Sequence, residues 1–277
     1  MRFRSYRSGK GAGVAVQDGA VWRDLGAVSL IDLIADGSIN NAAIAEGKPE
    51  IDMAGVTLLP VIPQPPKFIC VGLNYVDHAA ESPYKDLPTY PAFFPRFNSS
   101  LIGHEAPLIR PRASHEFDYE CELAVIIGKP ARHVSEENAL DHVAGYAIFN
   151  DGSLRNYQFL SVQWTPGKNF DGTGAFGPDL VTADELPAGG SGLQVQTILN
   201  GQVLQNGNTA DMIFPVAKLI SIASEFTTLE TGTVIATGTP AGVGFARKPP
   251  IFMKEGDVCE IHVEQLGVLR NEVRNEA

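Results

Sequence analysis

The chain has 277 residues, of which 44% are hydrophobic and 19% charged, and this composition indicates a folded globular protein and excludes global disorder. Its 32 acidic residues outnumber its 21 basic ones, and the formal net charge of −11 argues against nucleic-acid binding. The sequence has no apolar stretch of about 18 residues or more, so we expect no membrane span.

Cysteine usage favours a reducing compartment. Cys70, Cys121 and Cys259 lie far apart, without a CxxC pair, and their odd number argues against a disulfide framework. Cys70 and Cys121 stand in apolar runs, so we expect them to be buried thiols. The basic residues within positions 1–10 lead directly into a strand pattern, which indicates folded structure instead of a targeting peptide. We therefore expect a cytoplasmic protein.

The first part of the chain predicts a small N-terminal α/β domain, residues 1–60. Residues Gly13–Leu25 read as a hairpin around Asp18-Gly19, and Ser29 is a predicted N-cap of a short helix that ends before Gly37. The proline-rich connector at 57–66 separates this unit from a larger domain, residues 61–277.

The second part is dominated by short strands, which predicts a β-rich α+β fold. The apolar or alternating runs that we expect to be strands are Phe68–Leu73, Glu120–Gly128, Ala144–Phe149, Leu193–Leu199 and Thr233–Thr237. Hairpin turns are predicted at Asn200-Gly201 and Leu266-Gly267, and helices at Ser135–His142, capped by Ser135, and Pro215–Phe226.

Two glutamates at the start of one predicted strand are the first candidate site. Strand side chains alternate, so Glu120 and Glu122 lie on one face, followed there by the apolar Ala124 and Ile126. Two desolvated carboxylates would become protonated unless a cation compensated their charge. With Asp151 after the next strand, three oxygen ligands suit Mg²⁺ or Mn²⁺ better than Zn²⁺. The alternative is a solvated strand end.

Further polar pairs follow at helical spacing. His78 and Glu81 are three positions apart, as a general base and its orienting carboxylate would be, although an exposed ion pair is the simpler interpretation. A helical run at 152–158 would place Asp151, Arg155 and Gln158 on one side, or simply pair Asp151 with Arg155 in a salt bridge. Lys168 lies in a predicted loop and could be a solvated lysine.

The order of these segments resembles the fumarylacetoacetate hydrolase family over about residues 67–273. The resemblance rests on Ile69–Glu81, Ser99–Gly103, Asp118–Glu122, Asn150–Gln158, Gly167-Lys168 and Gly238–Gly244. It implies a mixed, rolled β-sheet with few short helices, a divalent metal and a homodimer.

The resemblance also implies a role for each candidate. Its metal ligands match Glu120, Glu122 and Asp151, and its water-activating pair matches His78 and Glu81. Residues that orient the substrate match Arg155, Gln158, Lys168 and Thr239. The expected metal is Mg²⁺, with Mn²⁺ or Ca²⁺ as alternatives. The chain departs from many members at Asn156, where they have Asp, and at Arg96, where they have Lys.

These residues lead to one main functional hypothesis and two alternatives. The main hypothesis is hydrolytic carbon–carbon cleavage of an acylpyruvate or 1,3-diketo acid, as in aromatic catabolism, with Lys168 stabilising the oxyanion. The first alternative is decarboxylation or keto–enol isomerisation of a 2-oxo acid such as oxaloacetate. The second is a non-catalytic protein that binds metal and a small molecule. Residues 77–91 are a predicted lid over the substrate.

Overall fold

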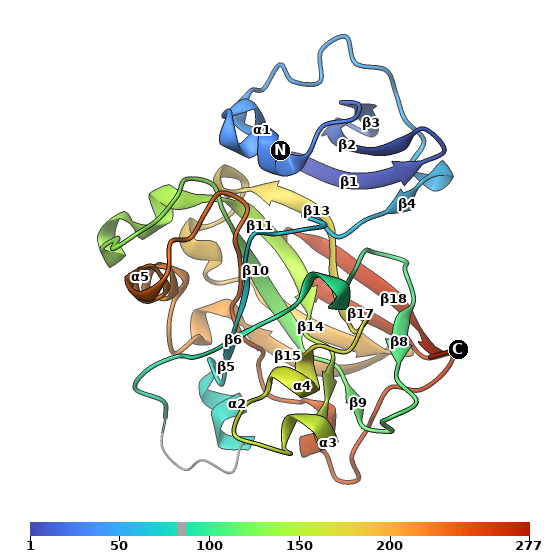
Figure 1. The fold of residues 1–277 in the computed structure, drawn as a ribbon, viewed down its shortest axis with the longest axis vertical. Coiled ribbons are helices and arrows are strands. Elements are labelled where there is room, and N and C mark those ends of the chain that lie inside the picture. The colour runs from blue at the N-terminus through green and yellow to red at the C-terminus, as the bar shows by residue number, and fades with distance from the viewer. Residues whose placement is uncertain (82–86) are drawn as a thin grey trace.

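The structure is a computed structural model that describes residues 1–81 and 87–277. In these residues a central sheet contains eleven strands (Figure 1). Nine of them follow one path, in the spatial order β3 (Val21–Asp24), β2 (Gly11–Asp18), β1 (Arg2–Ser8), β13 (Gly174–Thr182), β11 (Val143–Asn150), β10 (Cys121–Ile127), β16 (Val234–Ala236), β5 (Phe68–Gly72) and β6 (Ala92–Pro95). Off this path, β4 (Thr57–Leu58) pairs with β1 and β7 (Leu101–Ile102) with β13.

Smaller sheets and short helices complete the described part of the chain. The second sheet has the order β15 (Gln202–Asn208), β14 (Gln194–Leu199), β17 (Val258–Val263), β18 (Gly267–Asn275) and β8 (Leu108–Arg110). A two-stranded sheet pairs β9 (Phe117–Asp118) with β12 (Ser153–Leu154). The α-helices are α1 (Leu30–Ala35), α2 (Val76–Glu81), α3 (Arg155–Gln158), α4 (Thr165–Lys168) and α5 (Val216–Phe226). None of the helices described has the length and apolar character needed to cross a bilayer.

The predicted β-rich α+β class is confirmed, and the central sheet is mixed. β10 pairs antiparallel with both β11 and β16, whereas β16 and β5 run parallel. As a result, the start of β10 and the ends of β11, β16 and β5 meet at one edge of the sheet. Residues beyond these strand ends therefore converge, although they are distant in the sequence.

The two faces of β10 belong to two different cores, because side chains alternate along the strand. Leu123 and Val125 pack in a cluster with the second sheet and α5. Ala124 and Ile126 pack in a second cluster. The second cluster also contains apolar residues of the N-terminal segment, such as Phe3 and Leu30, which thereby cover this face of the central sheet.

The N-terminal segment is joined to the central sheet by backbone pairing. β1 pairs antiparallel with β13, with Arg2 opposite Val181 and Phe3 opposite Leu180. The hairpin of β2 and β3 and the helix α1, with Ser29 accepting a hydrogen bond from the Asp32 amide, are as predicted. The division into domains 1–60 and 61–277 stays a prediction.

Local expectations in the second part are confirmed with three exceptions, one of which is Lys168, predicted in a loop but found at the end of helix α4. Helix α5 begins after Pro215 as predicted, but residues Glu136–His142 form a 3₁₀ helix in which the Ser135 side chain makes no capping hydrogen bond. The third exception is the predicted helical run at 152–158, because Ser153–Leu154 is strand β12, paired with β9, and only Arg155–Gln158 is helical. All three cysteines are free and buried, as expected for Cys70 and Cys121.

Candidate active site

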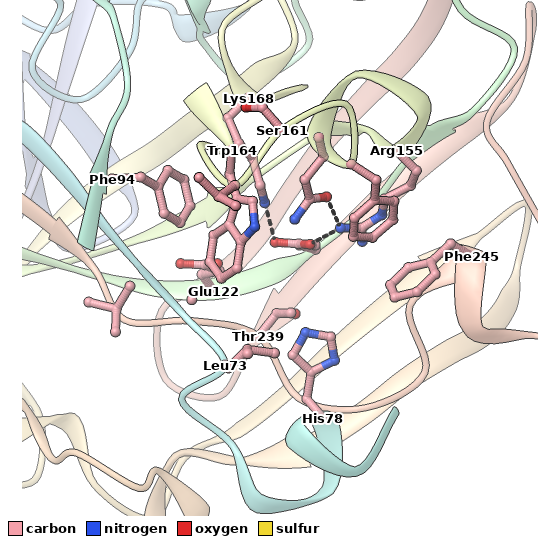
Figure 2. Close-up of a pocket in the computed structure, with 16 residues that line it drawn as sticks. Leu73, His78, Phe94, Glu122, Arg155, Ser161, Trp164, Lys168, Thr239 and Phe245 are labelled. Atoms are coloured by element: carbon pink, nitrogen blue, oxygen red, sulfur yellow. Dashed lines mark hydrogen bonds and ion pairs between the residues drawn. The ribbon is translucent and has the colours of Figure 1, made fainter. Parts of the chain in front are cut away.

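The candidate active site lies at the sheet edge where the four strand ends meet. The register places Cys121 of β10 opposite Asn150 of β11, and Ala236 of β16 opposite Cys70 of β5. Glu120 and Glu122 therefore flank the start of β10, and Asp151 directly follows β11. His78 reaches the same cavity from α2, which follows β5 (Figure 2).

The three predicted metal ligands come together. Glu120, Glu122 and Asp151 are buried, and each offers one oxygen within 4.8 Å of the others. The interpretation of Glu120 and Glu122 as a solvated strand end was wrong. The Gly238 amide donates to Oε2 of Glu122 at 2.9 Å, and the Asp151 amide donates to the Glu120 carbonyl at 3.0 Å. These contacts fix the cluster to the backbone on two sides.

The pKa values of the two glutamates are shifted in opposite directions. Burial, reinforced by Asp151 and Glu120, raises the pKa of Glu122 well above its usual range. Burial also raises the pKa of Glu120, but Lys168 and Arg155 outweigh it and hold this pKa at about 2. Glu122 is therefore a buried carboxyl whose ionised form lacks sufficient positive charge nearby. Three buried oxygen donors with such a deficit fit a hard divalent cation such as Mg²⁺ or Mn²⁺.

Lys168 is buried among these carboxylates, so its interpretation as a solvated loop lysine was wrong. Its Nζ donates to Oε2 of Glu120 at 2.8 Å and to Oδ2 of Asp151 at 2.7 Å. Burial alone would lower the pKa of Lys168, but Asp151 and Glu120 raise it above its usual value. Arg96 approaches Asp151 from the other side and pairs with its Oδ1. Two cations thus hold Asp151 in place.

Arg155 is held by residues other than the one predicted. The expected salt bridge with Asp151 was wrong, because β12 intervenes between the two residues. Instead, the Nε of Arg155 donates to Oδ2 of Asp118 at 2.8 Å, and its Nη1 lies 2.7 Å from Oε1 of Glu120 and from Oε1 of Gln158. Within residues 1–81 and 87–277, the buried Nη2 of Arg155 has no hydrogen-bond partner.

His78 and Glu81 form the predicted contact. They lie on α2, where Nδ1 of His78 is 3.1 Å from Oε2 of Glu81. Oε1 of Glu81 accepts a hydrogen bond from the Gly242 amide at 2.9 Å. His78 is 6% exposed and lines the cavity, so the pair is not the exposed ion pair of the simpler interpretation. In the predicted lid at 77–91, residues 82–86 lie outside the described residues.

The cavity has a volume of about 360 Å³ and combines this polar cluster with aromatic walls. One wall contains Phe94 and Trp164, whose ring centroids are 5.7 Å apart, beside Lys168 and Glu122 (Figure 2). A second wall, near Arg155, contains Phe159 and Phe245 at 5.6 Å. Thr239 also lines the cavity, and its hydroxyl accepts a hydrogen bond from Gln205 at 2.8 Å.

The sequence did not predict the contacts of two buried charges, and one of the two departures from the family pattern lies outside the cavity. Asp118 and Arg96 are both buried and contact predicted site residues, but each partner is remote in the chain and no local spacing reveals it. Asn156 is exposed and accepts a hydrogen bond from Ser114, so the departure there affects the surface and not the cavity.

The fold and the cavity define a β-rich protein with a buried oxygen-donor centre that could hold a divalent metal ion. Residues 67–274 match the sequence profile described as fumarylacetoacetate (FAA) hydrolase C-terminal. The chain therefore belongs to the fumarylacetoacetate hydrolase family, an enzyme family, as the resemblance implied.

Individual members refine this placement. The human protein named oxaloacetate tautomerase FAHD2A, mitochondrial, is 42% identical over 238 residues, which cover 85% of this chain and 75% of that protein. A fumarylacetoacetate hydrolase from Exiguobacterium antarcticum has a TM-score of 0.88 and 35% identity, with both chains fully covered. A maleylpyruvate hydrolase from Sphingobium sp. SYK-6, solved with manganese(II) and pyruvate, has a TM-score of 0.83 and 30% identity, again over both full chains.

Proposed function

We propose that this protein is a metal-dependent keto–enol tautomerase of small 2-oxo acids of the oxaloacetate type. The observation that carries the proposal is the cavity itself. Its lining includes Glu120 and Glu122 of a carboxylate cluster suited to a divalent ion, the buried Arg155, and His78, which contacts Glu81. The 42% identity to a protein named as an oxaloacetate tautomerase supports this choice of reaction.

Each residue of the cavity has a chemical task in this reaction. A divalent cation held by Glu120, Glu122 and Asp151, proposed to be Mg²⁺ or Mn²⁺, supplies a Lewis acid for the 2-oxo group. Arg155, together with Gln158, binds a substrate carboxylate. His78, oriented by Glu81, transfers a proton between the substrate oxygen and carbon 3, so that the enol loses its hydroxyl proton and gains a carbon-bound one. Lys168 stabilises negative charge on the substrate oxygen.

Hydrolytic carbon–carbon cleavage of an acylpyruvate, which the sequence favoured, is the second candidate. It is supported by the same histidine–glutamate pair and by the similarity to a maleylpyruvate hydrolase. In this reaction His78 would take a proton from water, the resulting hydroxide would add to the distal carbonyl carbon, and the carbon–carbon bond would break with its electron pair passing to the pyruvate enolate. The homodimer and the cytoplasmic location remain predictions.

One spectrophotometric experiment tests both candidates. Purified protein with Mn²⁺ or Mg²⁺ is offered the enol of oxaloacetate, acetylpyruvate and fumarylpyruvate in parallel, with Glu120→Ala as the control. Metal-dependent loss of the oxaloacetate enol absorbance, without release of CO₂, supports the tautomerase. Release of pyruvate and a free acid from the acylpyruvates, without loss of the oxaloacetate enol, would favour the hydrolase over the tautomerase. Release of CO₂ from oxaloacetate would indicate a decarboxylase.

A further inference from the structure

Asp118 is a buried carboxylate beside the cavity to which no role has been assigned so far. It is 0% exposed and ends strand β9, two positions before Glu120. Four N–H groups donate to it within described residues. Oδ1 accepts from the amides of Tyr119 and Gly244, both at 2.8 Å, and Oδ2 accepts from the Phe245 amide at 3.0 Å and from Nε of Arg155 at 2.8 Å.

These four contacts match what an ionised carboxylate can accept, since its two oxygens offer about four lone-pair sites. An asparagine at the same position would direct its amide N–H groups toward at least one N–H donor. The position therefore requires a negatively charged acceptor and not merely a polar side chain of the same shape.

The contacts of Asp118 fix the orientation of Arg155. The guanidinium is planar and carries its donors in a fixed fork. Asp118 engages Nε, while Glu120 and Gln158 engage Nη1, so the plane of the group is defined on two sides. Nη2 is the remaining nitrogen, and it has no partner among the described residues.

The same carboxylate also fixes the cavity wall next to that guanidinium. The ring of Phe245 lies 4.6 Å from Cζ of Arg155, and the Phe245 amide donates to Asp118. Gly244 is packed so closely that an added Cβ would lie 2.5 Å from Oδ1 of Asp118 and 1.9 Å from the Ile251 carbonyl oxygen. Asp118 thus connects Arg155 with the backbone at 244–245.

We propose that Asp118 is a positioning residue for substrate binding, which holds Arg155 and Phe245 in a fixed relation so that the guanidinium of Arg155, which lines the cavity, is oriented to bind a substrate carboxylate. This inference rests on the proposed function, because it needs Arg155 to be the carboxylate-binding group. Asp118 does not itself touch the substrate. It acts on binding through Arg155, and its effect must therefore disappear when Arg155 is absent.

The test is a calorimetric titration of the Mn²⁺-loaded protein with pyruvate, which carries one carboxylate beside a 2-oxo group. Asp118→Asn should weaken pyruvate binding about tenfold or more, which corresponds to about 1.4 kcal/mol per factor of ten. The affinity for Mn²⁺ alone should stay within about twofold. For oxaloacetate turnover, KM should rise by the same factor while kcat changes little, as expected when uniform binding is lost.

A double-mutant cycle separates positioning from general damage. Arg155→Met should weaken pyruvate binding at least as much as Asp118→Asn, and the double variant should bind no more weakly than Arg155→Met alone. Asp179→Asn is the matched control, because Asp179, on β13, is likewise a buried aspartate that pairs with arginine side chains, those of Arg2 and Arg4. It should leave pyruvate binding unchanged.

Results that contradict this inference can be told apart from results that contradict the proposed function. Unchanged pyruvate binding in Asp118→Asn, or effects that multiply in the double variant, would overturn the inference while the proposed function stands. Failure of the wild-type protein to bind pyruvate would overturn both. If the asparagine variant does not fold, Asp118→Glu is the second variant. Its longer side chain keeps the charge but displaces Arg155, so it must also weaken pyruvate binding.

Discussion

Nζ of Lys168 lies 2.8 Å from Oε2 of Glu120, inside the carboxylate cluster that we propose as the metal site. The lysine is 2% exposed and the glutamate 5%, so neither charge is compensated by water. Lys168 also contacts Asp151, and its positive charge, together with that of Arg155, holds the pKa of Glu120 at about 2.

We expect Lys168→Met to destabilise the metal-free protein by about 1–3 kcal/mol, because Glu120 and Asp151 each lose one buried charged donor but keep a second, Arg155 or Arg96. Added Mn²⁺ should restore much of this loss, because the ion binds the folded state only and replaces the missing positive charge. Urea unfolding with and without Mn²⁺ measures both effects. Equal stability of variant and wild type without metal would contradict the expectation.

Glu122→Gln should abolish most metal binding while the protein remains folded. An amide at this position matches the shape of the protonated carboxyl that the raised pKa favours, so the free energy of unfolding should not fall. Mn²⁺ affinity should fall by at least about 100-fold, since changes to outer-shell partners alone cost up to that factor. Titration calorimetry checks this, with Glu225→Gln, an exposed position on α5, as control.

Metal binding should release a proton, and affinity should fall as the pH is lowered. Burial raises the pKa of Glu122 well above its usual range, whereas a metal ligand must be ionised. The protonated carboxyl therefore competes with the metal at every pH below its raised pKa. Mn²⁺ titrations in two buffers of different ionisation enthalpy give the number of protons released. The same heat in both buffers would refute the expectation.

His78→Asn should lower kcat by about 10²–10⁴-fold, the range typical of a lost general acid or base. Mn²⁺ affinity should be unchanged, because His78 is not among the proposed ligands. His115→Gln, an exposed histidine outside the cavity lining, is the control and should retain full kcat. A variant at His78 with normal turnover would remove the histidine–glutamate pair from the mechanism.

Stability of the protein should fall as the pH is lowered from about 6.5, the usual pKa of histidine. Burial lowers the pKa of His104, whose Nδ1 accepts a hydrogen bond from the Arg270 amide at 3.0 Å. The unfolded chain thus binds a proton that the folded chain excludes, so this contribution is complete above about pH 6.5 and is lost as the pH falls through the folded pKa. Urea unfolding at pH 7.5 and 5.5 should show that the free energy of unfolding falls less between these two pH values in His104→Asn than in the wild type.

Local patterns predicted the strands and the face on which the glutamates lie. Alternation along Glu120–Gly128 is a property of the strand itself, so the shared face of Glu120 and Glu122 followed from it, as did the helix at Pro215–Phe226. The burial of these glutamates did not follow, because it depends on residues that are remote in the chain, such as Arg155, Lys168 and Trp164.

The contact partners of the buried charges could not be predicted from local patterns, because they are brought together only by the complete fold. Asp151 and Arg155 have helical spacing, but pairing of Ser153 with Asp118 turns the intervening residues into a strand and separates them. Arg96 stands 55 positions before Asp151 and has no local signature of that contact. The resemblance to a family supplied the list of site residues, whereas contacts such as that of Asp118 with Arg155 appear only in the structure.

The pairing of β1 with β13 has a consequence for the order of events during synthesis. Glu120, Asp151 and Lys168 all lie between Phe3 and Leu180, the two residues that this pairing joins. Closing so long a loop is entropically unfavourable, and on the ribosome it cannot occur before residue 180 has been added. All three carboxylates and Lys168 are therefore synthesised before the N-terminal segment can pair with the central sheet. The proposed metal site also needs Gly238, whose amide binds Glu122, so its assembly is a late step of synthesis.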